Sequence, residues 1–347
     1  MRGIPAGPLS LALLLGPFFG LCLAFWAVPL GLSVDLALQN PDYLPESREA
    51  AEPTASAEGA AGSSSPTGPT SFDFLNVDWE PETAEQETEE AAPPEKYLGT
   101  ENFRYVWADK RFHKALLNTA LYALCVILVT LPASFLLAHF LRSTPGRLRA
   151  VLSFSLLLPG LCLPGALATL FHLFFHGREG ALNQLFVVPF GFAPVNWMMD
   201  PSFILLALVL QGTWRWTGFV ALFFLCAMEA TPESHYEAAR VEGAGPWRTL
   251  WNVTLPSVRH VALFAAVFLL VDGFASFSGA YNLLGGSGGM LDSGLLLVSY
   301  LYQVAFPGGS GRFDFPAAAA MSLSVVPLLA LVTYLLLFFP GRKERPA

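Results

Sequence analysis

A serine flanked by glycines is the pattern in this sequence that comes nearest to a catalytic motif. Gly285-Gly286-Ser287-Gly288-Gly289 formally fits G-x-S-x-G, in which a strand-to-helix turn exposes a nucleophilic serine. The residues around Ser287 predict a flexible glycine loop instead, and the sequence assigns no histidine or acid to act with the serine. An intramembrane serine hydrolase is therefore kept only as an alternative.

Metal and cofactor chemistry is not expected of this chain. Two histidines lie at i and i+4, in His172-Leu-Phe-Phe-His176, but the glutamate of H-E-x-x-H is missing. No G-x-x-x-x-G-K-[ST] segment occurs, so the chain is not expected to bind ATP or Mg²⁺ itself. The cysteines show no C-x-x-C spacing, and we expect no disulfide because all of them lie in apolar stretches: Cys22, Cys125, Cys162 and Cys226.

Two charged residues interrupt apolar stretches that are otherwise free of charge. Arg215 and Asp272 would each cost about 2.5–3.5 kcal/mol at the centre of a membrane span, so each should face the protein interior or water. One interpretation is a solute path, which would also include Trp214, Phe277 and Tyr281. The alternative is a structural charge pair, with the tryptophan in an interfacial aromatic belt.

Composition predicts an all-α membrane protein. Of the 347 residues, 54% are hydrophobic and 13% are charged, and several apolar runs exceed the roughly 20 residues that cross a bilayer. We predict six spans, at approximately Leu9–Leu32, Ala115–Leu141, Ala150–His176, Ser202–Met228, Ser257–Tyr281 and Phe315–Phe339. Pro159 and Pro164 should break the third span, and Pro327 the sixth. The first span could alternatively be a cleaved signal peptide.

Most of the negative charge lies in one segment near the amino terminus. The formal net charge is −8, but residues 33–114 alone carry 17 acidic and 6 basic side chains, leaving +3 for the rest. Within this segment, residues 50–95 contain few large apolar residues and are expected to be disordered. The predicted organisation is a first span (1–32), an acidic outer segment (33–97), a five-span domain (98–341) and a basic tail (342–347).

Lysine and arginine in the short loops predict the orientation in the membrane. Basic residues follow the second, fourth and sixth predicted spans, whereas the loops on the other side carry Arg178 and Arg312 alone. By the positive-inside rule, both termini and the 229–256 loop should be cytoplasmic and the acidic segment outside. The apolar segment 294–306 is too short to cross and should form a re-entrant or surface helix on the outer side.

The cytoplasmic loop between the fourth and fifth predicted spans should be helical. Thr231 is a suitable N-cap with Pro232 at the first helical position, and Gly243 and Gly245 should end this helix. Pro246 should begin a second helix that runs to about Val253. Two short helices joined at glycines, between membrane spans, would present a rigid knob to the groove of a partner.

Short segments of this loop resemble the EAA signature of permease subunits in binding-protein-dependent ABC importers, closest to the maltose and glycerol-3-phosphate type. They are Tyr236-Glu237-Ala238-Ala239, Gly243-Ala244 and Leu255-Pro256, with Glu242 where the family usually has aspartate. Three further segments are similar to family patterns: residues 115–119 (A-L-L-N-T), residues 180–183 (G-A-L-N), and Gly285-Gly286 followed by residues 302–306 (Y-Q-V-A-F). Ser287 stands where the family has proline, which puts the outer-loop turn in doubt.

The resemblance implies a permease subunit without catalytic activity in a prokaryotic inner membrane. Its expected partners are a second permease subunit, two cytoplasmic ATPase subunits that hold ATP and Mg²⁺, an external solute-binding protein and membrane lipid, without nucleic acid. Residues 236–239 and Gly243 would form the coupling helix in the ATPase groove, and Gly285, Gly286 and Ser287 an outer gate loop. The solute would be a sugar or related polyol. A secondary carrier or channel is the alternative, although such proteins more typically show internal repeats.

Overall fold

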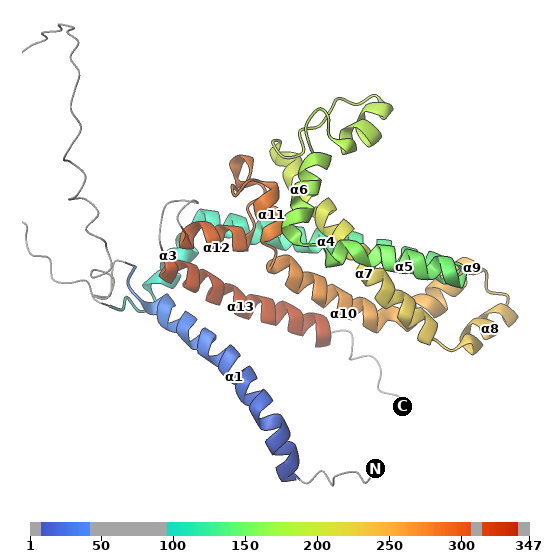
Figure 1. The fold of residues 1–347 in the computed structure, drawn as a ribbon, viewed down its shortest axis with the longest axis horizontal. Helices are drawn as coiled ribbons and strands as arrows, with labels where there is room; N and C mark the ends of the chain where they lie inside the picture. Colours follow the sequence, from blue (N-terminus) through green and yellow to red (C-terminus); the bar gives the residue numbers. More distant parts are fainter. Residues whose placement is uncertain (1–7, 42–95, 307–313, 339–347) are drawn as a thin grey trace, which may run out of the picture.

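The computed structural model describes residues 8–41, 96–306 and 314–338, and these residues are helical apart from their connections and one bridge between Gln39 and Tyr97 (Figure 1). The expected disordered stretch 50–95 and the basic tail lie outside the described residues. The long helices are α1 (Pro8–Leu38), α4 (Lys110–Arg142), α5 (Gly146–Leu161), α6 (Pro164–Phe174), α7 (Pro201–Ala230), α10 (Leu255–Phe274) and α13 (Phe315–Phe338). The shorter elements are α3 (Glu101–Ala108), η1 (Asn183–Val187), η2 (Val188–Phe190), α8 (Glu233–Val241), α9 (Pro246–Thr249), η3 (Leu250–Thr254), α11 (Ser278–Leu283), η4 (Met290–Asp292) and α12 (Leu297–Ala305).

Four helices in the described part of the chain are long and apolar enough to cross a membrane. They are Lys110–Arg142, Pro201–Ala230, Pro246–Phe274 and Phe315–Phe338, and α5 with α6 would make a fifth span if this bent pair counts as one. The described end of α1, Phe25–Leu38, is apolar but shorter. An all-helical architecture with four or five candidate spans therefore holds, whereas the sixth span stays a prediction.

Prolines bend the third candidate span and leave the last one intact. α5 and α6 meet at 98°, with Pro159 in the last turn of α5 and Pro164 opening α6. The expected break at Pro327 was wrong, because α13 continues through it from Phe315 to Phe338. A single proline removes one backbone hydrogen bond, which a long helix between neighbours tolerates. At the other break, two prolines within six residues leave no complete helical turn between them.

Two hydrophobic clusters hold the helices together. The larger one joins α4, α6, α7 and α10 around Phe224, Met228 and Leu269. The second joins α1, α3, the start of α4, α12 and α13, with Phe112 and Met321 buried inside it. Between them the clusters divide α4, whose two ends belong to different packing units. α4 is therefore the element through which the two halves of the bundle are fixed to each other.

The two ends of the acidic segment are pinned together. The N–H of Asn40 donates to the carbonyl of Lys96 (2.9 Å), and the N–H of Leu98 donates to the carbonyl of Leu38 (3.0 Å). The buried Asn102 amide donates to the carbonyls of Ala37 and Gln39, both at 2.8 Å. The end of α1 and the start of α3 are therefore held side by side.

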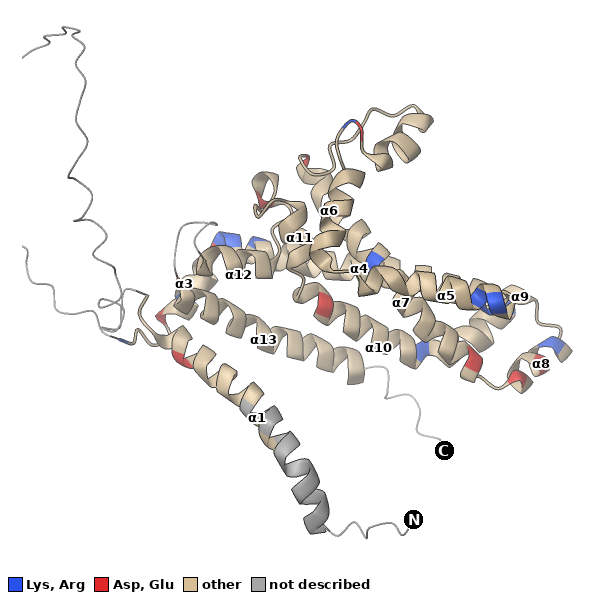
Figure 2. Cartoon of the chain, viewed as in Figure 1, with Lys and Arg blue, Asp and Glu red and all other residues tan. Residues whose placement is uncertain are grey.

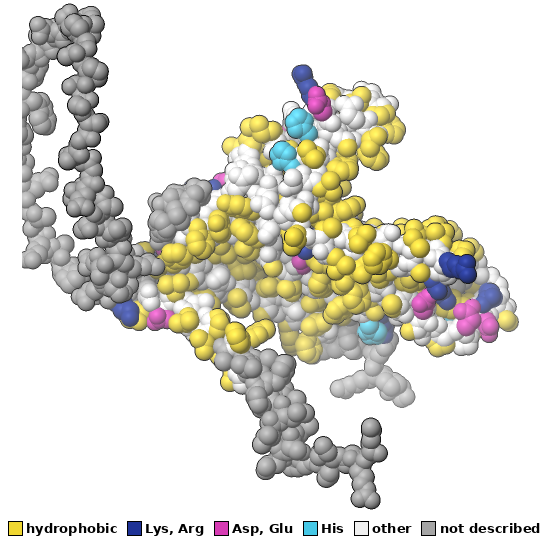
Figure 3. Space-filling view, viewed as in Figure 1, with side chains coloured by type: hydrophobic (Ala, Val, Ile, Leu, Met, Phe, Trp, Pro, Cys, Tyr) yellow, Lys and Arg dark blue, Asp and Glu magenta, His cyan; other side chains and the backbone are white. Residues whose placement is uncertain are grey.

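Charged residues gather at the two ends of the bundle (Figure 2). One end contains α8 and the start of α5, and the other contains α3, α12 and the start of α13. The flank between these ends is mostly hydrophobic (Figure 3). This distribution suits a bilayer that surrounds the middle of the bundle and leaves both ends in water.

A buried asparagine organises the connection between α6 and α7. Asn183 is fully buried, and its amide donates to the carbonyls of Gly177 and Val195, while its oxygen accepts from the indole N–H of Trp197 at 2.9 Å. A Cβ at Gly180 would lie 2.3 Å from the carbonyl oxygen of His176, so this turn requires glycine. The G-A-L-N segment is thus the structural centre of this loop.

Candidate functional site

A cavity of about 240 Å³ lies where α4, α6, α7, α10 and α11 meet. It is half-way along α4 and α7, between the two charged ends of the bundle. Its lining mixes apolar groups with polar and aromatic side chains, among them Tyr122, Gln211, Arg215, Trp216, Asp272, Ser276, Phe277 and Ser278. A concave, partly open space with several convergent polar groups is the usual form of a small-molecule site.

The two charged residues singled out in the sequence both line this cavity. The indole N–H of Trp216 donates to a carboxylate oxygen of Asp272 at 2.7 Å, and the guanidinium of Arg215 lies over the Trp216 ring, 4.7 Å from its centroid. Trp216 thus stands between the cation and the anion and contacts both. Aromatic contact and a charge-assisted hydrogen bond stabilise charges in a low-dielectric site without an ion pair.

Two buried donors at the cavity have no hydrogen-bond partner among the residues that the structure describes. They are Nε2 of Gln211 and Nε of Arg215. A buried donor without an acceptor costs about 1–3 kcal/mol, so such groups persist where a ligand or water completes them. The cavity is therefore suited to a solute that offers oxygen acceptors to donors and hydroxyl donors to Asp272.

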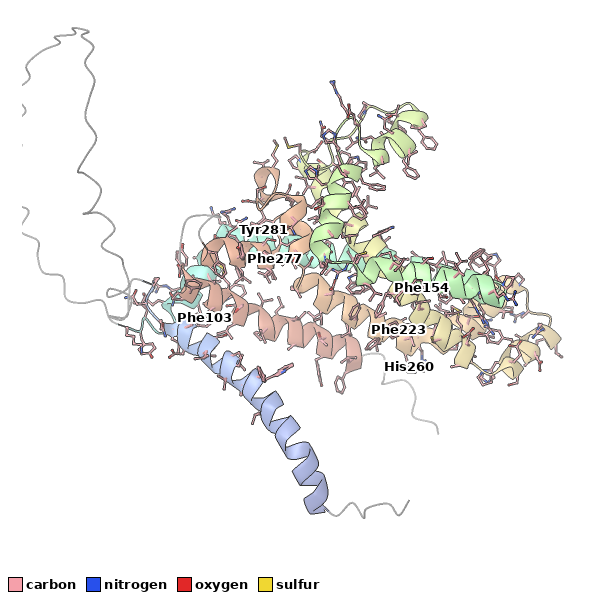
Figure 4. The ribbon with its side chains drawn as sticks, in the orientation of Figure 1. Phe103, Phe154, Phe223, His260, Phe277 and Tyr281 are labelled. Carbon is pink, nitrogen blue, oxygen red and sulfur yellow. The ribbon has the colours of Figure 1, made fainter. Side chains whose placement is uncertain are left out.

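The remaining residues of the expected solute path are placed differently. Phe277 lines the cavity. Tyr281 does not line the cavity but packs against Phe277, with ring centroids 4.9 Å apart (Figure 4). Trp214 is about half exposed and packs against Phe171 outside the cavity. Trp214 thus lies outside the cavity, whereas Trp216, two positions further along α7, lines it.

Sequence reasoning missed Gln211 and Tyr122 as cavity residues. Gln211 is a buried amide in the middle of an apolar span, so its polarity alone could have marked it. Tyr122 carries no comparable signal, because a tyrosine in a span is ordinary. The Tyr122 ring can lie against α7 because Gly212 has no side chain: an added Cβ there would lie 2.5 Å from the Tyr122 hydroxyl.

The expected outer gate loop is a tight glycine turn. Gly285 and Gly286 have positive φ of 62° and 79°, and the amide of Gln303 donates to the carbonyl of Gly286 at 3.0 Å. The Ser287 hydroxyl donates to the carbonyl of Leu284 at 2.7 Å and accepts from the N–H of Gly289. Helix α11 precedes this turn where a nucleophile elbow needs a strand, and the Ser287 hydroxyl caps its own turn.

The predicted coupling residues divide between two faces of α8. Tyr236 and Ala239 are buried against the bundle, whereas Glu237, Ala238 and Glu242 are exposed, and Val241 is 89% exposed. After Glu242 the helix ends at Gly243, which has a φ of 72°, and Ala244 then bonds back to the carbonyl of Ala239. The buried face attaches the helix to the bundle, and the outward face leaves an apolar side chain for a partner.

Arginines from the neighbouring helix ends hold α8 in place. The Arg142 guanidinium lies 4.1 Å from the centroid of the Tyr236 ring and 3.5 Å from Glu233, which also pairs with Arg240 at 2.7 Å. Arg149 on α5 pairs with Glu229 at the end of α7. Each exposed pair contributes little alone. Arg142 thereby connects α8 to the end of α4, and Arg149 connects the start of α5 to the end of α7.

Two expectations for this loop were wrong. Thr231 does not cap α8: it ends α7, its hydroxyl donates to the carbonyl of Ala227, and α8 begins at Glu233. Pro232 keeps Thr231 extended and so ends α7 there, but the Thr231 hydroxyl is engaged with the preceding helix and makes no cap bond to α8. The second helix does not stop near Val253. It runs through Leu255 and Pro256 into α10, because the wider η3 turn of Leu250–Thr254 accommodates the proline ring.

The sequence of this chain matches a known family of transport proteins. Residues 105–344 match the family described as "Binding-protein-dependent transport system inner membrane component". The chain is similar to the lactose transport system permease protein LacF of Rhizobium radiobacter, with 28% identity over 72% of this chain and 83% of the relative. It is also similar to the arabinooligosaccharides transport system permease protein AraP of Bacillus subtilis, with 30% identity over 67% of this chain and 73% of the relative.

A solved structure shares the fold. It is a chain of a bacterial ABC transporter involved in the import of the acidic polysaccharide alginate, with a TM-score of 0.62 over 72% of this chain and 85% of that one. The sequence identity is 19%, so this likeness concerns the arrangement of helices. The family match begins at residue 105, so the acidic segment lies outside the family match.

Proposed function

The chain belongs to the family of binding-protein-dependent transport system inner membrane components, and on that premise we propose that it is a permease subunit of an ATP-driven sugar importer. It is a multi-pass membrane protein whose similar relatives LacF and AraP are sugar transport permeases. In this role the chain catalyses no reaction. ATP and Mg²⁺ are held by partner ATPase subunits, and a second permease subunit supplies the other half of the path.

The observation that carries the proposal is the cavity between the two charged ends. Its unpartnered donors on Gln211 and Arg215, the Asp272 carboxylate and the Phe277 ring suit a sugar. A sugar ring presents hydroxyl oxygens around its edge and apolar C–H groups on its faces, so polar groups and an aromatic ring together recognise it. Oligosaccharide, polyol and glycerol phosphate share enough of this chemistry to remain within the proposed substrate class.

The direction of transport follows from the charge distribution. Arg142, Arg149 and Arg240 lie at the end of the bundle that contains α8, which supports a cytoplasmic position for that end and for both termini. The opposite end, with α3 and α12, then faces outside. There an external solute-binding protein would deliver the solute, and the solved alginate transporter structures include one bound to a periplasmic protein.

Coupling to ATP is assigned to the loop 229–256. When the ATPase subunits close on ATP, the exposed face of α8 moves with them, and the contacts of Arg142 with Tyr236 and Glu233 transmit this motion to α4. Turning a 1:99 equilibrium between inward- and outward-facing states into 99:1 requires about 5.5 kcal/mol of differential binding. A helix held on its inner face can transmit such a bias, whereas an unattached loop would absorb it.

The test is ATP-dependent uptake by vesicles that contain this chain with its second permease, ATPase and solute-binding subunits. The panel is lactose, an arabinooligosaccharide, maltotriose and glycerol 3-phosphate, and we expect accumulation of at least one of them. Gly243→Asp should abolish uptake at normal assembly, because it places a side chain at a positive φ on the docking face. Gly245→Asp is the matched control, since Gly245 has a φ of −68° and nothing within 4 Å of an added Cβ. Accumulation by vesicles that hold this chain alone would contradict the proposal.

A further inference from the structure

A row of polar residues near the start of α4 forms hydrogen bonds and an ion pair with the loop between α11 and α12. Arg111, Lys114 and Asn118 follow at spacings of three and four, so they share one face of the helix, with Thr119 beside them. All four bond to the segment 291–297, which is about 180 residues further along the chain. We refer to these four residues and their contacts as the α4 clamp.

The clamp acts chiefly on the backbone of the loop. Arg111 pairs with both carboxylate oxygens of Asp292 at 2.9 Å, and the Lys114 ammonium donates to the carbonyl of Leu291. The Asn118 amide donates to the carbonyls of Asp292 (2.9 Å) and Leu295 (3.2 Å). The Thr119 hydroxyl accepts from the N–H of Leu297 at 2.8 Å. Three of these contacts involve main-chain carbonyl groups of the loop, and the Asp292 carbonyl also accepts from the N–H of Leu295 at 3.3 Å within the loop.

The turn is strained at its exposed tip. Leu291 and Asp292 both have positive φ, 56° and 54°, a conformation that side chains other than glycine rarely adopt. The Leu291 side chain is 74% exposed, so burial of this side chain does not hold the conformation. The hydrogen bonds from α4 oppose the strain together with bonds inside the turn, such as that from the N–H of Asp292 to the carbonyl of Gly289 at 3.1 Å. Losing the bonds from α4 would favour relaxation of the turn.

The turn is directly connected to the wall of the cavity. Leu295 and Leu296 are fully buried, and Leu296 lines the cavity beside Tyr122 and Gln211. On its other side the loop packs against α7, where a Cβ at Gly294 would lie 2.4 Å from a methyl group of Ile204. A turn held between α4 and α7 thus positions the last wall residue before α12. Movement of the turn would move Leu296.

One contact of the clamp is open to exchange with water. The Arg111 and Asp292 side chains are 44% and 27% exposed, whereas Asn118 and Thr119 are buried. Arg111 lies in the first turn of α4, directly after α3. A charged group on a protein that docks at this end could replace either partner of the pair, while the buried contacts remain covered until the turn moves.

We propose that the α4 clamp is a latch that holds the outer wall of the cavity shut, and that the Arg111–Asp292 pair is its release element. The inference rests on the proposed function in treating the cavity as a solute path. With the pair intact, the strained turn keeps Leu296 in the wall. When the pair is broken, the turn relaxes and the cavity becomes accessible from the side of α3 and α12.

The experiment measures access to the wall with a membrane-impermeant maleimide added to the outside of vesicles containing the full complex. Leu296→Cys is introduced, and modification is followed by mass spectrometry of the peptide that contains position 296, so the native cysteines do not interfere. Arg111→Asp and Asp292→Arg should each raise the labelling rate at least tenfold, and the double swap should restore the slow rate. Arg178→Asp, a charge reversal in the other outer loop, should leave it unchanged.

Labelling that is equally slow in both single reversals, or that the double swap fails to slow again, overturns the proposal. Amide hydrogen exchange provides a second measurement on chains without the added cysteine. Exchange at residues 291–297 should accelerate in both single reversals and return to the wild-type rate in the double swap. Both readouts are independent of solute and ATP. A failed uptake assay would therefore reject the proposed function, whereas unchanged labelling and exchange would reject the latch.

Discussion

The contact between α5 and α7 allows a sharp test of the packing around the cavity. A Cβ placed on Gly218 would lie 1.9 Å from the carbonyl oxygen of Leu156 and 2.7 Å from its carbonyl carbon. Ordinary van der Waals contact begins at 3.4 Å, so Gly218→Ala requires the two helices to separate by about 1.5 Å. The obstacle is backbone, which cannot rotate away as a side chain would.

The expected cost follows from two opposing terms. Overpacking of a tight interior costs about 1–3 kcal/mol, and the upper value applies because backbone must move. Replacing glycine by alanine in a helix returns about 1 kcal/mol through its better helix propensity. We therefore expect Gly218→Ala to lose about 2 kcal/mol of stability and to reduce uptake, since α5 leads into α6 and thereby to the cavity wall at Pro164.

Gly160→Ala is the matched control on the same pair of helices. An added Cβ there would meet the Arg215 carbonyl oxygen and the Phe219 Cβ at 3.7 Å, which is ordinary contact. This variant should retain or slightly exceed the wild-type stability. The assay is thermal unfolding of the purified complex in detergent, followed by uptake in vesicles. Equal melting temperatures for the two variants would refute the argument from helix proximity.

Three further outcomes are expected. Trp216→Phe keeps the ring but removes the N–H that bonds Asp272, so thermal stability should fall by about 1.5–3 kcal/mol and uptake should decrease, whereas Trp214→Phe outside the cavity should change neither. Tyr236→Phe should be neutral or stabilising in the same assay, because the Tyr236 hydroxyl is buried without a partner. Burial and the hydrogen bond to Asp109 raise the pKa of Tyr300 above its ordinary value near 10. The stability that this raised pKa contributes is therefore fully present below about pH 10 and is lost only as the pH rises through the folded-state pKa, so the destabilisation by Tyr300→Phe should be equal at pH 6 and pH 8.

The candidate spans could be predicted from sequence because hydrophobicity over some 20 residues acts locally. The expected Ser202–Met228 span lies within α7, and the expected Ala115–Leu141 span lies within α4. Boundaries near proline were less accurate, as at Thr231 and Pro256. There the outcome depends on whether the neighbouring turn can widen or the preceding residue can extend. Composition does not encode these local geometries.

The cavity could be predicted only in part, for a different reason. Arg215 and Asp272 stand out because a charge in an apolar span is costly wherever it points. Tyr122 and Gln211 were not singled out, since their role depends on which helix faces meet. The same limit applies to the α4 clamp. Asn118 and Thr119 could be matched to a family pattern, but their contacts with a loop about 175 residues away require the folded chain.

Continuity between the loop 229–256 and the cavity explains why the second helix had to run further than expected. Pro246–Phe274 behaves as one element of 29 residues, with the η3 turn inside it and Asp272 near its far end. At 1.5 Å per residue, about 40 Å separates Pro246 from Asp272, which exceeds the hydrocarbon thickness of about 30 Å. A helix that ended at Val253 would leave a hinge between α8 and the cavity. Under the proposed function, the continuous helix would transmit a displacement of its Pro246 end to the Asp272 carboxylate that Trp216 contacts. The wider η3 turn accommodates the ring of Pro256, so the helix continues without a break from Pro246 to Phe274.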